Sequence, residues 1–424
     1  MLPRHFDHPP RGWNSYDTFD TTVTEKDILE QAAILRDTLL PYGYDHVVVD
    51  IQWYAAATGT MRDQFQYIPF STLSLDAYGR LQPDPEKFPS AVSGRGFRDL
   101  ADQIHAMGLK FGIHIMRGIP RIAAQNHLPI LGSSMTADMV ADPSSICGWN
   151  PDMYGVRNCE AGQAWYNSII SQYAEWGVDF IKCDDICNTN LYASHFVAPH
   201  EIEMLRRAID SVDRPITLSL SPGPALLEKS WFYRRNANMW RITDDFWDEW
   251  EPLKTMFSVC ERWQDHVHEG GYPDCDMLPL GYVGKGFRHD RKTSFTADEQ
   301  KTMMTLWCLF RSPLMLGADM TRMDDDTLKL LTCRELLVLE GEDFVPCQLE
   351  HTEDAAIWLS SNGKDTYVAL FNLSDTDQVI ALPASRLERE SLGGREIWTG
   401  AEAEASTCLK CSLAPHACAI YHLL

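Results

Sequence analysis

The chain has 424 residues and is 45% hydrophobic, enough to bury one large core and a smaller second one, since single domains rarely exceed roughly 250–300 residues. Its 60 acidic against 37 basic residues give a formal net charge of -23, which repels nucleic-acid phosphates and anionic lipid. We therefore expect two domains and a neutral small-molecule partner, and neither nucleic acid nor a membrane.

The N-terminal sequence "MLPRHFDHPPRGWNSYD" has no apolar run of signal-peptide length, and no segment reaches the ~18 uninterrupted apolar residues of a membrane span. On that basis we expect a cytoplasmic protein, although removal of an export signal would leave the same sequence. The 12 cysteines are scattered, and the close pair Cys408 and Cys411 lacks a second pair to complete a zinc site. Buried free thiols are therefore favoured over a disulfide framework.

The first 343 residues repeat one local pattern, an amphipathic helix that ends at a glycine shortly before an apolar strand. Gly43, Gly108 and Gly177 are the predicted helix ends. A capping box at 296–299 begins a later helix. The strands are predicted, in chain order, at residues 11–16, 46–50, 110–115, 179–184, 215–221, 238–244, 276–281 and 312–319. Eight such strands separated by helices predict a (β/α)8 barrel.

After about residue 343 the pattern changes. The stretch "AAIWLSSNGKDTYVALFNLSDTDQVIALPAS" alternates apolar and polar residues over short strands, with Asn-Gly and Ser-Asp turns and no helical period. We therefore predict an α/β protein with a (β/α)8 TIM barrel over residues 1–343. A C-terminal antiparallel β-sandwich domain follows over residues 344–424, and because no long linker separates the two, we expect a packed interface.

Polar side chains stand where the predicted barrel strands end, which is where barrel enzymes carry their active sites. In "VDFIKCDDIC", residues 178–187, strand alternation places Lys182 and Asp184 on one face and turns Asp185 away. The same alternation in "WRITDD" pairs Arg241 with Asp245 and turns Asp244 away. The complete ring of predicted strand-end groups is Trp13, Asn14, Asp50, His114, Lys182, Asp184, Ser221, Arg241, Asp245, Asp276 and Asp319.

Two carboxylates that face one pocket suit glycoside hydrolysis, in which one attacks the sugar and the other donates a proton. The Lys182 ammonium would keep Asp184 ionised as a nucleophile, and Asp245 would be the acid. Aspartates at strand ends also cap turns. His114 is equally compatible with a structural role and a substrate contact, and Trp149 with a sugar platform and loop packing.

Six short motifs then resemble a known family in order and spacing. They are "RGWNSYD", the strand ending in Asp50 with Trp53 after it, "GVDFIKCD", "MWRITDD", "PDCDMLPLG" and "RSPLMLGADM". Together they resemble the α-galactosidase family of retaining glycosidases, glycoside hydrolase family 27, over ~330 residues from position 11. The resemblance implies a nucleophile at Asp184, an acid/base at Asp245, and a C-terminal β-sandwich. The implied or candidate substrate contacts are Trp13, Asp50, Trp53, His114, Lys182, Ser221 and Arg241.

Three positions depart from the family pattern. Ile51 stands where members commonly carry a second aspartate, His114 stands in place of a tyrosine, and Ser221 replaces a glutamate that contacts the 2-hydroxyl. A retaining exo-glycosidase acting on terminal α-D-galactosyl residues, free or in an oligosaccharide, is the first expectation. The alternatives are a β-L-arabinopyranoside, which lacks the hydroxymethyl group, and an α-N-acetylgalactosaminide.

Other function classes fit the residues less well. An aldolase would use Lys182 as a Schiff base, but Asp184 two residues away would keep that amine protonated. A metal-dependent hydrolase would need clustered histidines, and only His5 and His8 approach this, ahead of the first strand. A non-catalytic sugar-binding protein would not need both carboxylates. We expect neither metal nor organic cofactor.

Overall fold

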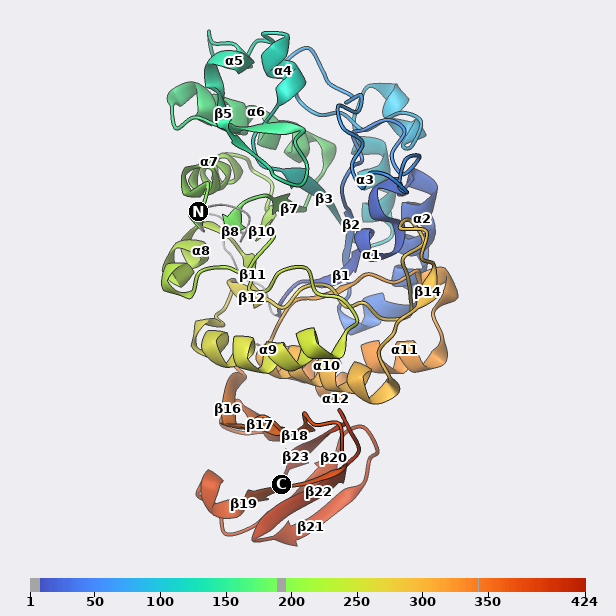
Figure 1. The fold of residues 1–424 in the computed structure, drawn as a ribbon, viewed down its shortest axis with the longest axis vertical. Helices are drawn as coiled ribbons and strands as arrows, with labels where there is room; N and C mark the ends of the chain where they lie inside the picture. Colours follow the sequence, from blue (N-terminus) through green and yellow to red (C-terminus); the bar gives the residue numbers. More distant parts are fainter. Residues whose placement is uncertain (1–7, 189–195, 342) are drawn as a thin grey trace.

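The computed structural model describes residues 8–188, 196–341 and 343–424 of the chain. Parallel strands form one eight-stranded sheet in the order β12-β11-β10-β7-β3-β2-β1-β15, and the sheet curls into a barrel (Figure 1). The ends of the sheet meet where Leu278, which follows β12, pairs with Leu316 of β15. The strands are β1 Arg11–Asn14, β2 His46–Val49, β3 Lys110–Met116, β7 Phe180–Asp184, β10 Thr217–Leu220, β11 Met239–Arg241, β12 Tyr272–Asp274 and β15 Leu314–Leu316. The predicted barrel is confirmed.

The seventh strand lies earlier than predicted. We placed it at 276–281, whereas β12 occupies Tyr272–Asp274 and includes Pro273. A proline normally argues against a strand because it donates no ladder hydrogen bond. Here β12 is an end strand of the sheet, and its ladder pairs it with β11 alone, so the missing N–H is tolerated. Asp276 has a φ of 80°, which turns the chain out of the strand direction.

Helices cover the outside of the barrel, and the predicted signals at their ends are present. The three predicted end glycines have positive φ angles of 88°, 80° and 86°. Thr296 and Glu299 form the predicted capping box of α10. The helices are α1 Tyr16–Phe19, α2 Glu25–Ile34, α3 Arg98–Ala106, α4 Arg121–Gln125, α5 Ala137–Val140, α6 Glu160–Trp176, α7 Pro199–Asp210, α8 Ser230–Asn236, α9 Trp250–Trp263, α10 Ala297–Phe310, α11 Asp325–Leu331 and α12 Arg334–Leu337.

The C-terminal strands form two antiparallel sheets with an apolar core between them. One sheet has six strands in the order β16-β17-β18-β23-β20-β21, and the other pairs β19 with β22. The strands are β16 Val345–His351, β17 Ala355–Ser361, β18 Thr366–Asn372, β19 Gln378–Pro383, β20 Leu392–Glu396, β21 Glu402–Ser406, β22 Cys408–Leu413 and β23 Cys418–Leu423. The predicted β-sandwich is confirmed.

The two domains share a packed interface, as expected. In Figure 1 the C-terminal strands lie against the side of the barrel that carries α9, α10 and α12. The rings of Phe257 in α9 and Phe371 in β18 lie 4.9 Å apart between centroids. The Trp398 indole N–H donates to Thr305 Oγ1 of α10 at 3.0 Å. The apolar core of the barrel therefore continues into one face of the sandwich.

The remaining strands are short and lie in the loops of the barrel: β4 Ile119–Pro120, β5 Ala141–Ile146, β6 Met153–Val156, β8 Cys187–Asn188, β9 Phe196–Val197, β13 Tyr282–Val283 and β14 Arg291–Lys292. Throughout the described part of the chain, helices fall short of the length and apolarity needed to cross a bilayer.

Candidate active site

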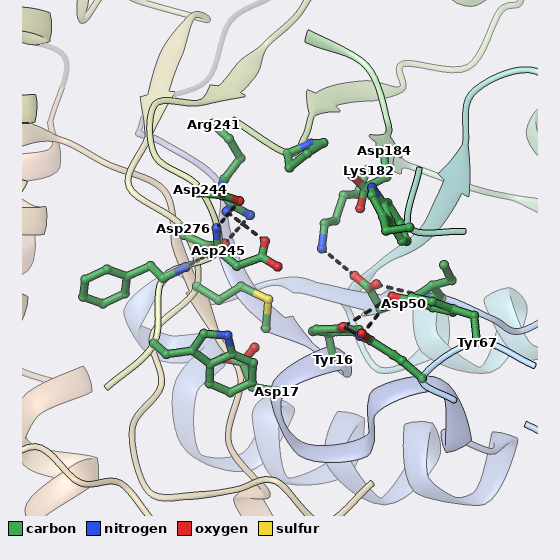
Figure 2. Close-up of a pocket in the computed structure, with 17 residues that line it drawn as sticks. Tyr16, Asp17, Asp50, Tyr67, Lys182, Asp184, Arg241, Asp244, Asp245 and Asp276 are labelled. Carbon is green, nitrogen blue, oxygen red and sulfur yellow. Dashed lines mark hydrogen bonds and ion pairs between the residues drawn. The ribbon is translucent and has the colours of Figure 1, made fainter. Parts of the chain in front are cut away.

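A pocket of about 260 Å³ opens at the carboxyl ends of the barrel strands. Sites for drug-sized ligands usually measure roughly 300–1,000 Å³, so this volume suits a single sugar ring. Figure 2 shows two facing walls, with Asp50, Lys182 and Asp184 on one and Arg241, Asp245 and Asp276 on the other. The lining residues are Tyr16, Asp17, Asp50, Ile51, Gln66, Tyr67, Trp149, Lys182, Asp184, Pro222, Arg241, Asp244, Asp245, Phe246, Trp247, Asp276 and Met277.

Asp184, the last residue of β7, is held on two sides. Its Oδ2 lies 3.1 Å from Nε2 of the buried His114 in β3, and its Oδ1 accepts the backbone N–H of Asp185 at 2.9 Å. Burial opposes ionisation, but the hydrogen bond from His114 and the charge of Lys182 outweigh it and lower the pKa of Asp184 to about 2. The carboxylate is therefore ionised and restrained.

Lys182 carries the positive charge of the same wall. Its Nζ donates to Asp50 Oδ2 at 2.9 Å and lies 5.6 Å from the ring centroid of Tyr16. Burial acts to lower the pKa of Lys182, but Asp50 and Asp184 raise it. Burial likewise opposes ionisation of Asp50, and Lys182 is the main group that keeps its pKa low. This ion pair joins the ends of β7 and β2 across the intervening strand β3, and Asn14 of β1 donates to the same Asp50 oxygen at 2.8 Å.

Asp245 stands on the opposite wall in a different environment. Its side chain is 64% exposed, and its Oδ1 lies 3.2 Å from the guanidinium of the buried Arg241. Arg241 also pairs with Asp276 Oδ1 at 2.8 Å. Because β11 ends at Arg241, Asp245 lies on the loop after the strand. Arg241 thus bridges the exposed carboxylate and the buried floor of the pocket.

Asp17 and Asp276 line the pocket, and Asp274 lies behind it beside a smaller cavity that Asp276 also lines. Burial and the charge of Asp276 raise the pKa of Asp274 to about 7, against the effect of Arg241. Burial and then Asp276 also raise the pKa of Asp17 well above its usual range. Both shifts favour the protonated form, and a protonated carboxyl group can donate as well as accept a hydrogen bond.

The residues described show no cluster of three or more histidine, cysteine or acidic side chains that could hold a metal ion. The pocket instead presents cationic donors, ionised acceptors and aromatic rings. These are the groups that bind the hydroxyls and apolar faces of a neutral sugar.

Known proteins with this fold identify the family. A family model described as alpha galactosidase A matches residues 131–342, and the alpha galactosidase C-terminal beta sandwich domain matches residues 352–423. The crystal structure of a GH27 β-L-arabinopyranosidase variant from Geobacillus stearothermophilus, in complex with arabinose, is 45% identical to the chain. It covers 98% of this chain and 97% of that one, with a TM-score of 0.93. The chain belongs to glycoside hydrolase family 27.

Two further proteins are similar to this family-27 enzyme at lower identity. A candidate α-N-acetylgalactosaminidase from Bacillus halodurans is 42% identical, with a TM-score of 0.86, and the match covers 98% of this chain and 97% of that chain. Alpha-galactosidase 3 of Arabidopsis thaliana is 27% identical over 339 residues, which is 79% of this chain and 60% of that protein. The chain is therefore a glycoside hydrolase for galactosides or related sugars, and the predicted family and enzyme class are confirmed.

The structure brings five predicted site residues together at this pocket: Asp50, Lys182, Asp184, Arg241 and Asp245. His114 is fully buried and reaches the pocket only through Asp184. Ser221 is buried behind the pocket, beside a cavity of about 20 Å³. The expected direct contact of these two side chains with substrate is therefore not supported by their positions.

Trp13 and Trp53 do not line the pocket of the family-27 enzyme. Both are fully buried, and their indole N–H groups donate to the backbone oxygens of Ala318 and His114, each at 2.7 Å. Asn14 points into the barrel toward Asp50, so strand alternation turns its neighbour Trp13 outward. As substrate contacts these two predictions are corrected, because both rings pack in the core around the pocket.

Several lining residues were missed by the sequence analysis. Tyr16, two positions beyond the end of β1, lines the pocket, whereas the predicted contact Trp13 does not. Asp244 was predicted to point away, yet it lines the pocket, because the chain is already a loop and strand alternation no longer applies. Trp149, left open between two roles, lies at the pocket with Tyr67, their ring centroids 5.2 Å apart. Tyr67 belongs to a loop that carried no signal in the sequence.

Proposed function

We propose that this family-27 enzyme is a retaining exo-glycosidase in which Asp184 is the nucleophile and Asp245 the general acid/base. The observation that carries the proposal is the contrast between the two carboxylates across one sugar-sized pocket. Asp184 is restrained and ionised, as a nucleophile needs. Asp245 is 64% exposed and can exchange protons with solvent.

In the first half-reaction the Asp184 carboxylate attacks the anomeric carbon while Asp245 gives its proton to the glycosidic oxygen. The aglycone leaves as an alcohol and the sugar remains as an ester of Asp184. In the second half-reaction Asp245, now ionised, takes a proton from water, and that water attacks the anomeric carbon. The ester bond to Asp184 breaks and the configuration is retained.

The pocket wall supports a preference for β-L-arabinopyranosides over α-D-galactosides, which rank second. The two sugars share ring stereochemistry, and the arabinopyranoside lacks the hydroxymethyl group. Ile51 lines the pocket next to Asp50 and offers no hydrogen-bond partner through its side chain. A sugar hydroxyl left unmatched in a dry pocket costs about 1–3 kcal/mol, or roughly ten- to hundredfold in selectivity. The 45% identity to a β-L-arabinopyranosidase supports the same choice.

The α-N-acetylgalactosaminide ranks last. A larger 2-substituent was expected to fit beside Ser221, where many relatives carry glutamate. The cavity next to Ser221 measures about 20 Å³, enough for about one water molecule and too small for an acetamido group.

The test is kcat/KM on a panel of nitrophenyl glycosides of β-L-arabinopyranose, α-D-galactose, α-N-acetylgalactosamine and α-D-glucose. We expect the arabinopyranoside to be best and the galactoside second. Proton NMR of the early reaction should show the first product with the anomeric configuration of the substrate. An inverted first product would contradict the mechanism, and a best rate on the glucoside would contradict the choice of sugar.

A further inference from the structure

The residue that follows the nucleophile has an unusual backbone conformation. Asp185 has a φ of 55°, in the left-handed region that glycine adopts readily and other residues adopt at a cost in strain. The aspartate is 2% exposed and lies outside the pocket lining, so its side chain does not act on the substrate directly.

The Asp185 side chain belongs to a buried ionic network. Its Oδ2 pairs with the guanidinium of Arg117 at 2.9 Å. The other side of that guanidinium pairs with Glu201 Oε1 at 3.0 Å, and the Tyr166 hydroxyl donates to Glu201 Oε2 at 2.5 Å. All of these side chains are buried. A buried ion pair often adds little to folding stability compared with apolar packing, so a functional reason for it is worth testing.

The same arginine also holds the backbone directly after the nucleophile's side chain, at two successive carbonyl groups. The backbone N–H of Arg117 donates to the carbonyl oxygen of Asp184 at 3.0 Å, and its Nε donates to the carbonyl oxygen of Asp185 at 2.5 Å. Between these two anchors, the Asp185 N–H donates to Asp184 Oδ1 at 2.9 Å. The orientation of the Asp184 carboxylate therefore depends on a peptide group that Arg117 and Asp185 restrain.

We propose that Arg117 and Asp185 are positioning residues that hold the Asp184 carboxylate in line for attack on the sugar. This inference rests on the proposed function, since it assumes that Asp184 is the nucleophile. The guanidinium, the Asp185 carboxylate and the left-handed turn act as one unit. A displacement of about 1 Å at a reacting group can cost about a hundredfold in rate while leaving ground-state binding intact.

The chain offers a matched control at the other end of the same strand. Asp179, just before β7, pairs with Arg214 at 2.5 Å and lies 2.8 Å from His105 Nε2. This ion pair also ties β7 to its surroundings but lies at the amino end of the barrel, away from the pocket. Asp179→Asn therefore tests the cost of losing a structural ion pair on β7 without disturbing Asp184.

The experiment compares Asp185→Asn, Arg117→Lys and Asp179→Asn with the parent enzyme. Measured are kcat on the best glycoside of the panel, the inhibition constant of the free sugar, and the rate of inactivation by its 2-deoxy-2-fluoroglycosyl fluoride. We expect Asp185→Asn to lower kcat and the inactivation rate about ten- to hundredfold, with less than a twofold change in the inhibition constant. Asp179→Asn should leave all three within about twofold.

The pH dependence of kcat/KM distinguishes loss of Asp184 positioning from a general loss of packing around β7. The Asp185 N–H is one of the groups that lower the pKa of Asp184. Weakening it should move the acid limb of kcat/KM to higher pH in Asp185→Asn and leave it unmoved in Asp179→Asn. If Asp185→Asn does not fold, Arg117→Lys, which keeps the cation but loses the fork, must show the same loss of kcat with unchanged sugar binding.

Equal losses of kcat in Asp185→Asn and Asp179→Asn, or a parent-like kcat in both Asp185→Asn and Arg117→Lys, would overturn the inference. Failure of the underlying mechanism is recognised separately. Mass spectrometry of the inactivated parent enzyme should find the fluorosugar on Asp184, and a label on another residue would refute the nucleophile without any of these variants.

Discussion

The two walls of the pocket carry the same chemical group in opposite settings. On one wall the Asp184 carboxylate receives hydrogen bonds from His114 and from the Asp185 backbone, and its pKa is lowered to about 2. On the other wall Asp245 is 64% exposed and has one guanidinium neighbour at 3.2 Å. A nucleophile benefits from a fixed, ionised carboxylate, whereas an acid/base must gain and lose a proton in every cycle. In the proposed mechanism, the environment rather than the residue type distinguishes the two roles.

The first prediction concerns Asp184, the restrained carboxylate. Asp184→Asn keeps the shape of the side chain but replaces the attacking carboxylate by a poor nucleophile. We expect kcat to fall by a factor on the order of 10⁴ or more on every glycoside, since no covalent intermediate can form. Steady-state assays with nitrophenyl and unactivated glycosides measure this. Residual activity within tenfold of the parent enzyme would give the nucleophilic role to another group.

The second prediction concerns Asp245, the exposed carboxylate. Asp245→Ala should lower kcat/KM about 10²- to 10⁴-fold on glycosides with poor leaving groups, which need a proton. Nitrophenyl glycosides should be largely spared in the first step, and added azide should accelerate turnover and give a glycosyl azide of retained configuration.

The neighbouring Asp244 provides the matched control for Asp245→Ala. It also lines the pocket and is exposed, but the roles above leave it out of the chemistry. Asp244→Asn should change kcat/KM less than about fivefold on both classes of leaving group. An equal effect of the two variants would mean that the pocket needs the negative charge rather than a proton donor.

The third prediction changes the preferred sugar and leaves both Asp184 and Asp245 in place. Ile51→Asp restores the paired aspartates that many family members carry at the end of β2. We expect the ratio of kcat/KM for the α-galactoside to that for the β-L-arabinopyranoside to rise roughly ten- to hundredfold. Ile51→Asn, which is polar but uncharged, is the control. An unchanged ratio would show that the hydroxymethyl position lies elsewhere in the pocket.

The fourth prediction concerns pH. Among the groups that lower the pKa of Asp184, His114 is the strongest, and burial acts in the opposite direction. His114→Phe removes the donor, so the pKa of Asp184 should rise from about 2 toward the ordinary value of an aspartate. Activity needs the ionised form and is lost as the pH falls through this pKa, so the acid limb of kcat/KM should move to higher pH. The lowered pKa of Asp184 also adds to the free energy of unfolding at pH values above the pKa of an unfolded aspartate, and this contribution is lost as the pH falls through the folded-state pKa. His114→Phe should therefore also lower the free energy of unfolding at neutral pH.

His114→Gln is the control for this profile, because the amide keeps a neutral donor near the carboxylate. Its acid limb should lie between those of the parent enzyme and His114→Phe. If both variants keep the parental profile, His114 does not determine the ionisation of Asp184.

The sequence by itself determined the features that depend only on neighbouring residues in the chain. The period of apolar residues predicted the barrel strands and the sandwich, glycines predicted three helix ends, and the capping box predicted the start of α10. Alternation along β7 correctly placed Lys182 beside Asp184 and turned Asp185 away. Alternation was wrong for Asp244, because the chain has already left β11 there, and the seventh strand was placed too late because β12 contains Pro273.

Only the tertiary structure decided which groups meet at the pocket. Lys182 and Asp50 are 132 positions apart in the chain, His114 and Asp184 are 70 apart, and Arg117 and Asp185 are 68 apart. Such pairs follow from the order of strands around the barrel, which brings β2, β3 and β7 side by side. No local pattern encodes that proximity, because each contact depends on the position of two distant segments packed against a common core.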